Sequence, residues 1–261
     1  MDCTTQPSID PSPVVLANQF DCFSAESRTY NQDGLITMHD CSFMSEPRFA
    51  AAYRAAQQTG SWSGPWGQAQ IHWRAHVLCW AAATVDHLPG DWVECGVNHG
   101  GTAMLLLKYM RLDQQTTRRM YLYDTFQGLD PRVSSDIELK NFHGIYQECY
   151  AEVCARFAAY PNVIIRRGSI PESLQTRAPE QVAFLHLDLN ASLPERRAIE
   201  FFWERLTPGG IVILDDYAWV SCSQQKTEMD DFARGYQVPI LSLPTGQGML
   251  MKPALQPVEV Q

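Results

Sequence analysis

The sequence is short of positive charge, of paired cysteines and of long apolar runs. Its 20 Lys and Arg residues against 29 Asp and Glu residues give a formal net charge of -9, and no basic stripe appears, so we expect no nucleic-acid partner. The eight cysteines form no Cys-x-x-Cys pair, which favours free thiols in a reducing compartment. No apolar run reaches the roughly 18 residues of a membrane span, and the first twenty residues lack the pattern of a signal peptide. We therefore expect a cytoplasmic protein that does not bind membranes.

What the sequence does contain is typical of one sizeable α/β enzyme domain with an extension. The chain has 261 residues, of which 45% are hydrophobic and 19% charged. Residues 1–45 predict a loosely structured N-terminal arm that could act as a lid, and residues 46–90 predict a helical extension with helices at 47–58 and 71–88. The second helix has an apolar surface too broad for a helix that faces solvent. We expect it to pack on a sheet or on a second copy of the chain, which would make a homodimer or a larger homo-oligomer.

Short apolar runs alternate with helical segments over residues 91–255, the main domain. Strands are predicted at WVECGV, MYLYD, NVIIRRG, VAFLHLD and IVILDD, each bounded by Gly, Pro or Asp. Five successive strand and helix units imply parallel strands. The runs VPILSLP and GQGMLMKP, joined at Thr245-Gly246, would end the sheet with an antiparallel pair. The predicted fold class is α/β, with a seven-stranded, mostly parallel, doubly wound sheet whose last strand is antiparallel.

Two adjacent carboxylates, Asp215 and Asp216, follow the buried run at 211–214. Open α/β sheets bind ligands at the carboxyl ends of their strands. Two close carboxylates repel each other unless a cation lies between them, so a divalent metal is one interpretation. The other is that Asp216 caps the next helix while Asp215 is solvated.

Polar residues also follow other predicted strands. The turn at Glu94–Thr102 has glycines that let a ligand approach the backbone, and the next helix offers N–H groups to a carboxylate or phosphate, although a simple tight turn would look the same. Asp124 follows the second strand, where an acidic side chain can accept hydrogen bonds from ribose hydroxyls. Asp188 and Asn190 follow the fourth strand, at the same rim as the carboxylate pair. A set of oxygen donors suits Mg²⁺ better than zinc.

Six motifs occur in an order that resembles one enzyme family. They are ECGVNHGGTA, YDTFQGL, RGSIPESL, FLHLDLN, LTPGGIVILDDY and LPTGQGMLMKP. The set resembles the macrocin O-methyltransferase family of class I S-adenosylmethionine-dependent methyltransferases, which decorate sugars of macrolide and aminocoumarin antibiotics. The resemblance covers roughly residues 43–253. It implies a Rossmann-like methyltransferase fold and methyl transfer to a hydroxyl of a sugar or another secondary metabolite.

The same resemblance implies which residues hold the cofactor and the metal. S-adenosylmethionine would contact residues from four strand ends: Glu94, Gly96, Val97, Gly101 and Thr102 at its methionine end, Asp124 at its ribose, Gly168 and Ser169 at its adenosine edge, and also Thr125, Phe126 and Asp188. Mg²⁺ would be held by Asp188, Asp215 and Asp216.

One residue departs from the family pattern. The family commonly has Asp-x-Asp at the end of the fourth strand, with the second Asp as the proposed base, whereas this chain has Asp188-Leu189-Asn190. A neutral amide cannot accept a proton, so Asn190 would orient the acceptor hydroxyl or bind the metal. Deprotonation would then depend on the metal, a water, or a histidine such as His143 or His99. The predicted catalytic residues are Asp188, Asn190 and His143, although His143 can equally be a solvated residue of the long 127–147 connection.

Two other functions remain open at this point. A metal-assisted hydrolase would keep the carboxylate cluster and turn over without S-adenosylmethionine. A non-catalytic S-adenosylmethionine-binding protein would keep the fold, and Asn190 would then mark the loss of activity.

Overall fold

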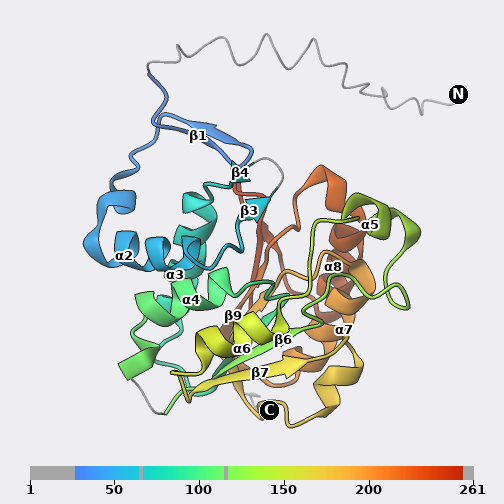
Figure 1. Ribbon diagram of the computed structural model, residues 1–261. Helices are drawn as coiled ribbons and strands as arrows, with labels where there is room; N and C mark the ends of the chain where they lie inside the picture. Colours follow the sequence, from blue (N-terminus) through green and yellow to red (C-terminus); the bar gives the residue numbers. More distant parts are fainter. Residues whose placement is uncertain (1–26, 65–66, 115–116, 255–261) are drawn as a thin grey trace, which may run out of the picture.

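A seven-stranded sheet runs through the centre of the computed structural model, which describes residues 27–64, 67–114 and 117–254 (Figure 1). The strand order is β10-β11-β9-β8-β5-β6-β7, and all neighbours from β9 to β7 are parallel. β11 is antiparallel to both β9 and β10, so the predicted sheet and its antiparallel end are confirmed. The strands are β5 (Asp91–Cys95), β6 (Met120–Asp124), β7 (Val163–Arg167), β8 (Val182–Leu187), β9 (Leu206–Leu214), β10 (Leu241–Ser242) and β11 (Gly248–Met251).

β10 is shorter than the apolar run at 238–244 predicts. Only Leu241 and Ser242 pair with β11, and both are exposed. Pro239 and Pro244 flank the strand, and proline cannot donate a hydrogen bond to a sheet ladder. The strand therefore forms only the two-residue outer edge of the sheet.

Helices cover both faces of the sheet, because alternate strand residues point in opposite directions. Trp92 of β5 packs in the cluster formed with α3, α4 and α6, whereas its neighbour Val93 packs in the cluster formed with α7 and α8. The α-helices are α2 (Pro47–Gln57), α3 (His72–Thr84), α4 (Gly101–Tyr109), α5 (Asp136–Asn141), α6 (Tyr150–Phe157), α7 (Ser192–Trp203) and α8 (Ser223–Tyr236), and the 3-10 helices are η2 (Ser42–Ser45), η3 (Leu112–Gln114), η4 (Glu172–Gln175) and η5 (Val220–Cys222). No helix in these described segments is both long and apolar enough to cross a membrane.

α2 and α3 lie within residues 46–90, the segment predicted as a helical extension. Phe49 of α2 and Ala75 of α3 share a core cluster with Leu105 of α4. Leu78 of α3 packs in the same cluster as Trp92, on the face of the sheet that α4 and α6 cover. One side of α3 is therefore buried on the domain. Trp80, on the same helix, keeps 50% of its surface exposed. The homo-oligomer stays a prediction.

The N-terminal arm differs from the loose structure predicted for it. β1 (Tyr30–Gln32) and β2 (Leu35–Thr37) pair as an antiparallel hairpin, whereas residues 1–26 lie outside the described part of the chain. The turn residues Asp33 and Gly34 both have positive φ, at 52° and 71°. Two positive φ angles are the requirement of a type I′ turn, which Asp-Gly favours strongly. The Asp-Gly pair was therefore the sequence signal for this hairpin.

The 127–147 connection contains the short helix α5, which is fixed to the domain by one buried side chain. Glu138 accepts hydrogen bonds from the backbone N–H of Ser135, at 2.7 Å, and from that of Ser192 at the start of α7, also at 2.7 Å. The first bond belongs to a capping box that begins α5. The second holds the connection against the loop that carries Asn190.

Candidate functional site

A cavity of about 510 Å³ opens beside the carboxyl ends of β5, β6 and β8. Its lining includes every residue predicted to hold the cofactor except Gly101, together with Asn190. Gln32 of the hairpin, Trp62 and Tyr146 complete other parts of the wall. Residues from strand ends far apart in the sequence thus meet at one rim, as a parallel sheet requires.

The side chain of Asp124 fixes the glycine-containing turn that follows β5 through hydrogen bonds to its backbone. The carboxylate Oδ2 of Asp124 accepts hydrogen bonds from the backbone N–H groups of Val97 and Asn98, at 2.6 Å and 2.7 Å, and Oδ1 accepts from Phe126 N–H at 2.7 Å. The N–H of Gly101 donates to Ser61 Oγ at 2.7 Å. Several N–H groups that the sequence offers to an anion therefore already have partners. Asp124 lines the cavity and also shapes the turn, and its contact with the ribose stays a prediction.

Glu94 and His186 lie at the base of the site, both buried. The Oε1 atom of Glu94 lies 3.4 Å from Nδ1 of His186, whereas its Oε2 atom has no hydrogen-bond partner among the described residues. Burial raises the pKa of Glu94, although His186 opposes this shift. An unpaired buried oxygen in a cavity wall favours a ligand that donates a hydrogen bond.

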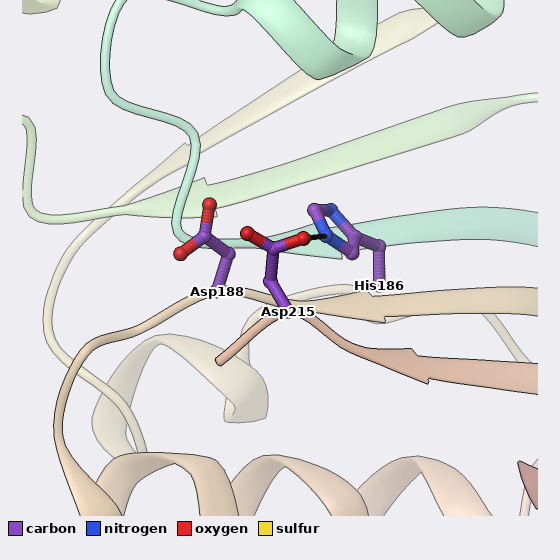
Figure 2. A group of neighbouring side chains, drawn as sticks. All are labelled: His186, Asp188 and Asp215. Atoms are coloured by element: carbon purple, nitrogen blue, oxygen red, sulfur yellow. Dashed lines mark ion pairs between the residues drawn. The ribbon is translucent and has the colours of Figure 1, made fainter. Parts of the chain in front are cut away.

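A group of three side chains from β8 and β9 could hold a metal ion. One ligand atom each of His186, Asp188 and Asp215 lies within 4.8 Å of the others. Figure 2 shows that one carboxylate oxygen of Asp215 is paired with His186 and that the other points toward Asp188. Asp216, the third predicted ligand, is not part of this group. Its Oδ1 atom lies 3.5 Å from Nη1 of Arg74.

Arg74 of α3 is a buried site residue that the sequence analysis missed. Its Nη1 donates to Asp215 Oδ2 at 2.5 Å, and its Nη2 and Nε donate to the two carboxylate oxygens of Asp33 at 2.8 Å and 3.0 Å. Burial opposes the charged guanidinium, but the carboxylates of Asp215 and Asp33 raise the pKa of Arg74 well above its usual value. A single arginine within the apolar run of α3 was the available signal, because a buried charge needs a partner.

The carboxyl groups of this site differ in the direction in which their surroundings shift the pKa. Burial opposes ionisation of Asp215, but Arg74 and His186 hold its pKa below the usual range. Burial and the neighbouring Asp215 raise the pKa of Asp188, and the same two causes raise the pKa of Asp216 to about 6. For His186, burial lowers the pKa, but Asp215 and Glu94 outweigh this and raise it to about 10. Negative charge is in excess here, so a further cation would be stabilised.

Asn190 lies next to Asp188, whereas the histidines proposed as bases do not. Asn190 is buried, with a φ of 55°, and its Nδ2 donates to Asp188 Oδ1 at 3.3 Å. His143 is exposed and does not line the cavity. The Nδ1 atom of His99 lies 3.2 Å from Glu152 Oε2, on the surface of the α4 and α6 side. The structure therefore brings Asp188 and Asn190 together but leaves His143 apart.

Glu195 of α7 is a buried carboxyl whose ionisation should control stability. Burial, then the nearby Asp216 and Asp215, raise its pKa to about 8 from 4.5. Because the folded value lies above the unfolded one, the folded protein retains a proton that the unfolded chain has released, so stability falls as pH rises between these values and then levels off. The Oε1 atom accepts both hydrogen bonds of this side chain, from Leu189 N–H and Gln225 Nε2.

Glu195→Gln should remove this fall in stability with rising pH. The Oε1 atom of the amide can accept both hydrogen bonds, and the amide has no ionisable proton. Between pH 5 and pH 8 we expect the unfolding free energy of the variant to fall less than that of the parent, by about 1–3 kcal/mol. Urea unfolding across this range measures it. Parallel pH profiles for the two proteins would contradict the assignment.

Comparisons with known proteins identify a family. Residues 72–243 match the family model described as Macrocin-O-methyltransferase (TylF). The chain is 30% identical over 155 residues to the 8-demethyl-8-(2,3-dimethoxy-alpha-L-rhamnosyl)-tetracenomycin-C 4'-O-methyltransferase of Streptomyces olivaceus, covering 55% of this chain and 59% of that one. It is 27% identical over 168 residues to the Mycinamicin III 3''-O-methyltransferase of Micromonospora griseorubida, covering 59% of this chain and 65% of that one. The chain thus spans less than two thirds of the length of each of these relatives.

A solved structure has the same fold. The O-methyltransferase NovP superposes with a TM-score of 0.67 at 17% sequence identity, covering 79% of this chain and 98% of that one. The Rossmann-like class I methyltransferase fold predicted from the motifs is therefore confirmed.

Proposed function

Because the chain belongs to the macrocin-O-methyltransferase family, we propose that it transfers the methyl group of S-adenosylmethionine to a hydroxyl of a sugar or another secondary metabolite, with Mg²⁺ bound at the carboxylate cluster. The observation that carries the proposal is the convergence of the predicted cofactor residues, Asp188 and Asn190 on one cavity. The names of the two relatives describe methylation of a rhamnosyl tetracenomycin and of a mycinamicin, which supports a sugar as the acceptor.

The cavity wall suits the cofactor in charge and in shape. The unpaired Oε2 of Glu94 can accept a hydrogen bond from the ammonium group at the methionine end of S-adenosylmethionine. Gly96 lies so close to the backbone of Asp188 that no side chain would fit, and its backbone lines the cavity. Asp124 lines the wall where we place the ribose, Gly168 and Ser169 line it where we place the adenosine edge, and Thr125 and Phe126 also line the cavity.

The carboxylate cluster suits a hard divalent cation. Asp188 and Asp215 offer oxygen atoms from neighbouring strand ends, and the charge of Arg74 does not neutralise the cluster. Mg²⁺ bound there would stabilise negative charge on the acceptor oxygen as its proton leaves. Asn190 cannot take that proton, so we assign it the task of orienting the acceptor hydroxyl beside Asp188.

Calorimetry tests the cofactor part of the proposal directly. We expect S-adenosylmethionine and S-adenosylhomocysteine to bind cofactor-free protein with a dissociation constant between about 1 µM and 1 mM. A folded sample that binds neither would refute the proposal.

The metal and the chemistry need a second experiment. With glycosylated metabolites as acceptors, we expect the chain with Asn190 intact to form methylated product, and chelation followed by Mg²⁺ addition should abolish and restore it. Full turnover in chelator would remove the metal from the proposal. Cofactor binding with no turnover until Asn190→Asp is made would instead identify a protein that has lost its activity.

A further inference from the structure

Arg74 contacts the Asp215 oxygen that points toward Asp188. The Oδ1 atom of Asp215 is paired with His186, at 3.5 Å, and accepts a hydrogen bond from Gln247 Nε2 at 3.0 Å. The other oxygen, Oδ2, is the one that points toward Asp188 in Figure 2, and Arg74 Nη1 lies 2.5 Å from it. Any cation bound between Asp188 and Asp215 would therefore share Oδ2 with a guanidinium.

Asp33 holds the other side of the same guanidinium. Two parallel hydrogen bonds join Nε and Nη2 of Arg74 to the Asp33 carboxylate, a geometry that a lysine could not reproduce. The turn that carries Asp33 is itself packed against the domain. A Cβ atom added to Gly34 would lie 2.9 Å from the indole of Trp219, and the Arg74 guanidinium lies 5.4 Å from that ring.

We propose that Arg74 is an internal counter-ion that competes with the divalent cation for Asp215, and that Asp33 retains the guanidinium when the cation binds. This inference rests on the proposed function, since it needs the cation site. Two positive charges on one carboxylate oxygen repel each other, so each weakens the binding of the other. Arg74 contacts Asp33 and Asp216 as well as Asp215. The guanidinium therefore still has carboxylate partners when it is released from Asp215.

The direction in which cation affinity changes on loss of Arg74 distinguishes this proposal from a role in which Arg74 only orients Asp215. If Arg74 only oriented Asp215 as a metal ligand, its loss would weaken cation binding by about 10–100-fold. As a competitor, its loss should strengthen cation binding. Loss of Asp33 should act in the opposite direction, because the guanidinium would then have only Asp215 and Asp216 as partners.

Mn²⁺ is the probe, measured by calorimetry and by its free paramagnetic resonance signal on cofactor-free protein. We expect Arg74→Gln to bind Mn²⁺ about tenfold more tightly than the parent and Asp33→Asn to bind it about tenfold more weakly. Arg234→Gln and Asp231→Asn are the controls, since they remove one charge each from an exposed ion pair on α8 and should match the parent. S-adenosylhomocysteine affinity within about twofold of the parent checks that each variant is folded.

Arg74→Gln leaves buried carboxylates without a partner, so it can fail to fold without metal. Folding that is rescued by Mn²⁺ supports the proposal, because the cation then replaces the guanidinium. If Arg74→Gln folds neither with nor without Mn²⁺, Asp33→Asn is the deciding variant. Weaker Mn²⁺ binding by Asp33→Asn supports the proposal, and unchanged or tighter Mn²⁺ binding overturns it. If the parent binds Mn²⁺ and Arg74→Gln binds it equally or more weakly, the competition between Arg74 and the cation is overturned, but the proposed metal site is not. No Mn²⁺ binding by parent or variant overturns the proposed metal site as well.

Discussion

Asp188→Asn should reduce methyl transfer by about 10³-fold or more, while the affinity for S-adenosylhomocysteine changes by no more than about threefold. Asp188 lines the cavity beside Asn190, and one of its oxygens lies within 4.8 Å of ligand atoms of Asp215 and His186. The substitution keeps the size of the side chain but removes the charge that would bind the cation. Single-turnover methyl transfer and calorimetry measure the two quantities. Near-parental transfer would show that Asp188 holds no cation during the reaction.

Asp216→Asn is the comparison that identifies the third ligand. The sequence predicts Asp188, Asp215 and Asp216 as the metal set, whereas the structure groups Asp188 and Asp215 with His186. Asp216 lies 3.5 Å from Arg74 instead. A loss as large as that of Asp188→Asn would support the predicted set. A loss of about tenfold or less would favour the set that the structure brings together.

The sequence was most informative where strand ends determine position. β5, β6, β8 and β9 are short apolar runs with polar residues directly after them, and parallel pairing places those residues at one rim. Asp188, Asn190 and Asp215 could therefore be placed near one another before any coordinates were known. The same argument placed Asp124 at the cavity, because it ends β6.

The sequence was least informative where a contact depends on how separate elements pack. Arg74 lies 41 residues from Asp33 and 141 residues from Asp215, and no local pattern joins them. The hydrogen bonds between Asp124 and the turn after β5 depend on the path of that turn. The contact of Glu138 with the N-terminus of α7 joins segments 54 residues apart, and no local pattern shows that His143 of the same connection lies outside the cavity.

Gly96→Ala should destabilise the protein more than any other single methyl addition at the site. A Cβ atom at this position would lie 1.8 Å from the backbone oxygen of Asp188 and 2.4 Å from its carbonyl carbon. Because both neighbours are backbone atoms, they cannot move aside without shifting the end of β8. We expect a loss of about 4 kcal/mol or more in unfolding free energy, and loss of cofactor binding in any folded fraction. Urea unfolding and calorimetry with S-adenosylhomocysteine measure the two effects.

Gly60→Ala is the matched control, because it separates backbone strain from steric overlap. Gly60 has a φ of 83° and Gly96 a φ of 90°, so alanine is similarly disfavoured by the backbone at both positions. A Cβ at Gly60 would have no neighbour within 4 Å. Its substitution should cost only about 1–2 kcal/mol and leave cofactor binding intact. Equal losses of unfolding free energy in the two variants would contradict the steric explanation. Backbone strain at positive φ, and not the close approach to Asp188, would then explain why glycine is needed at position 96.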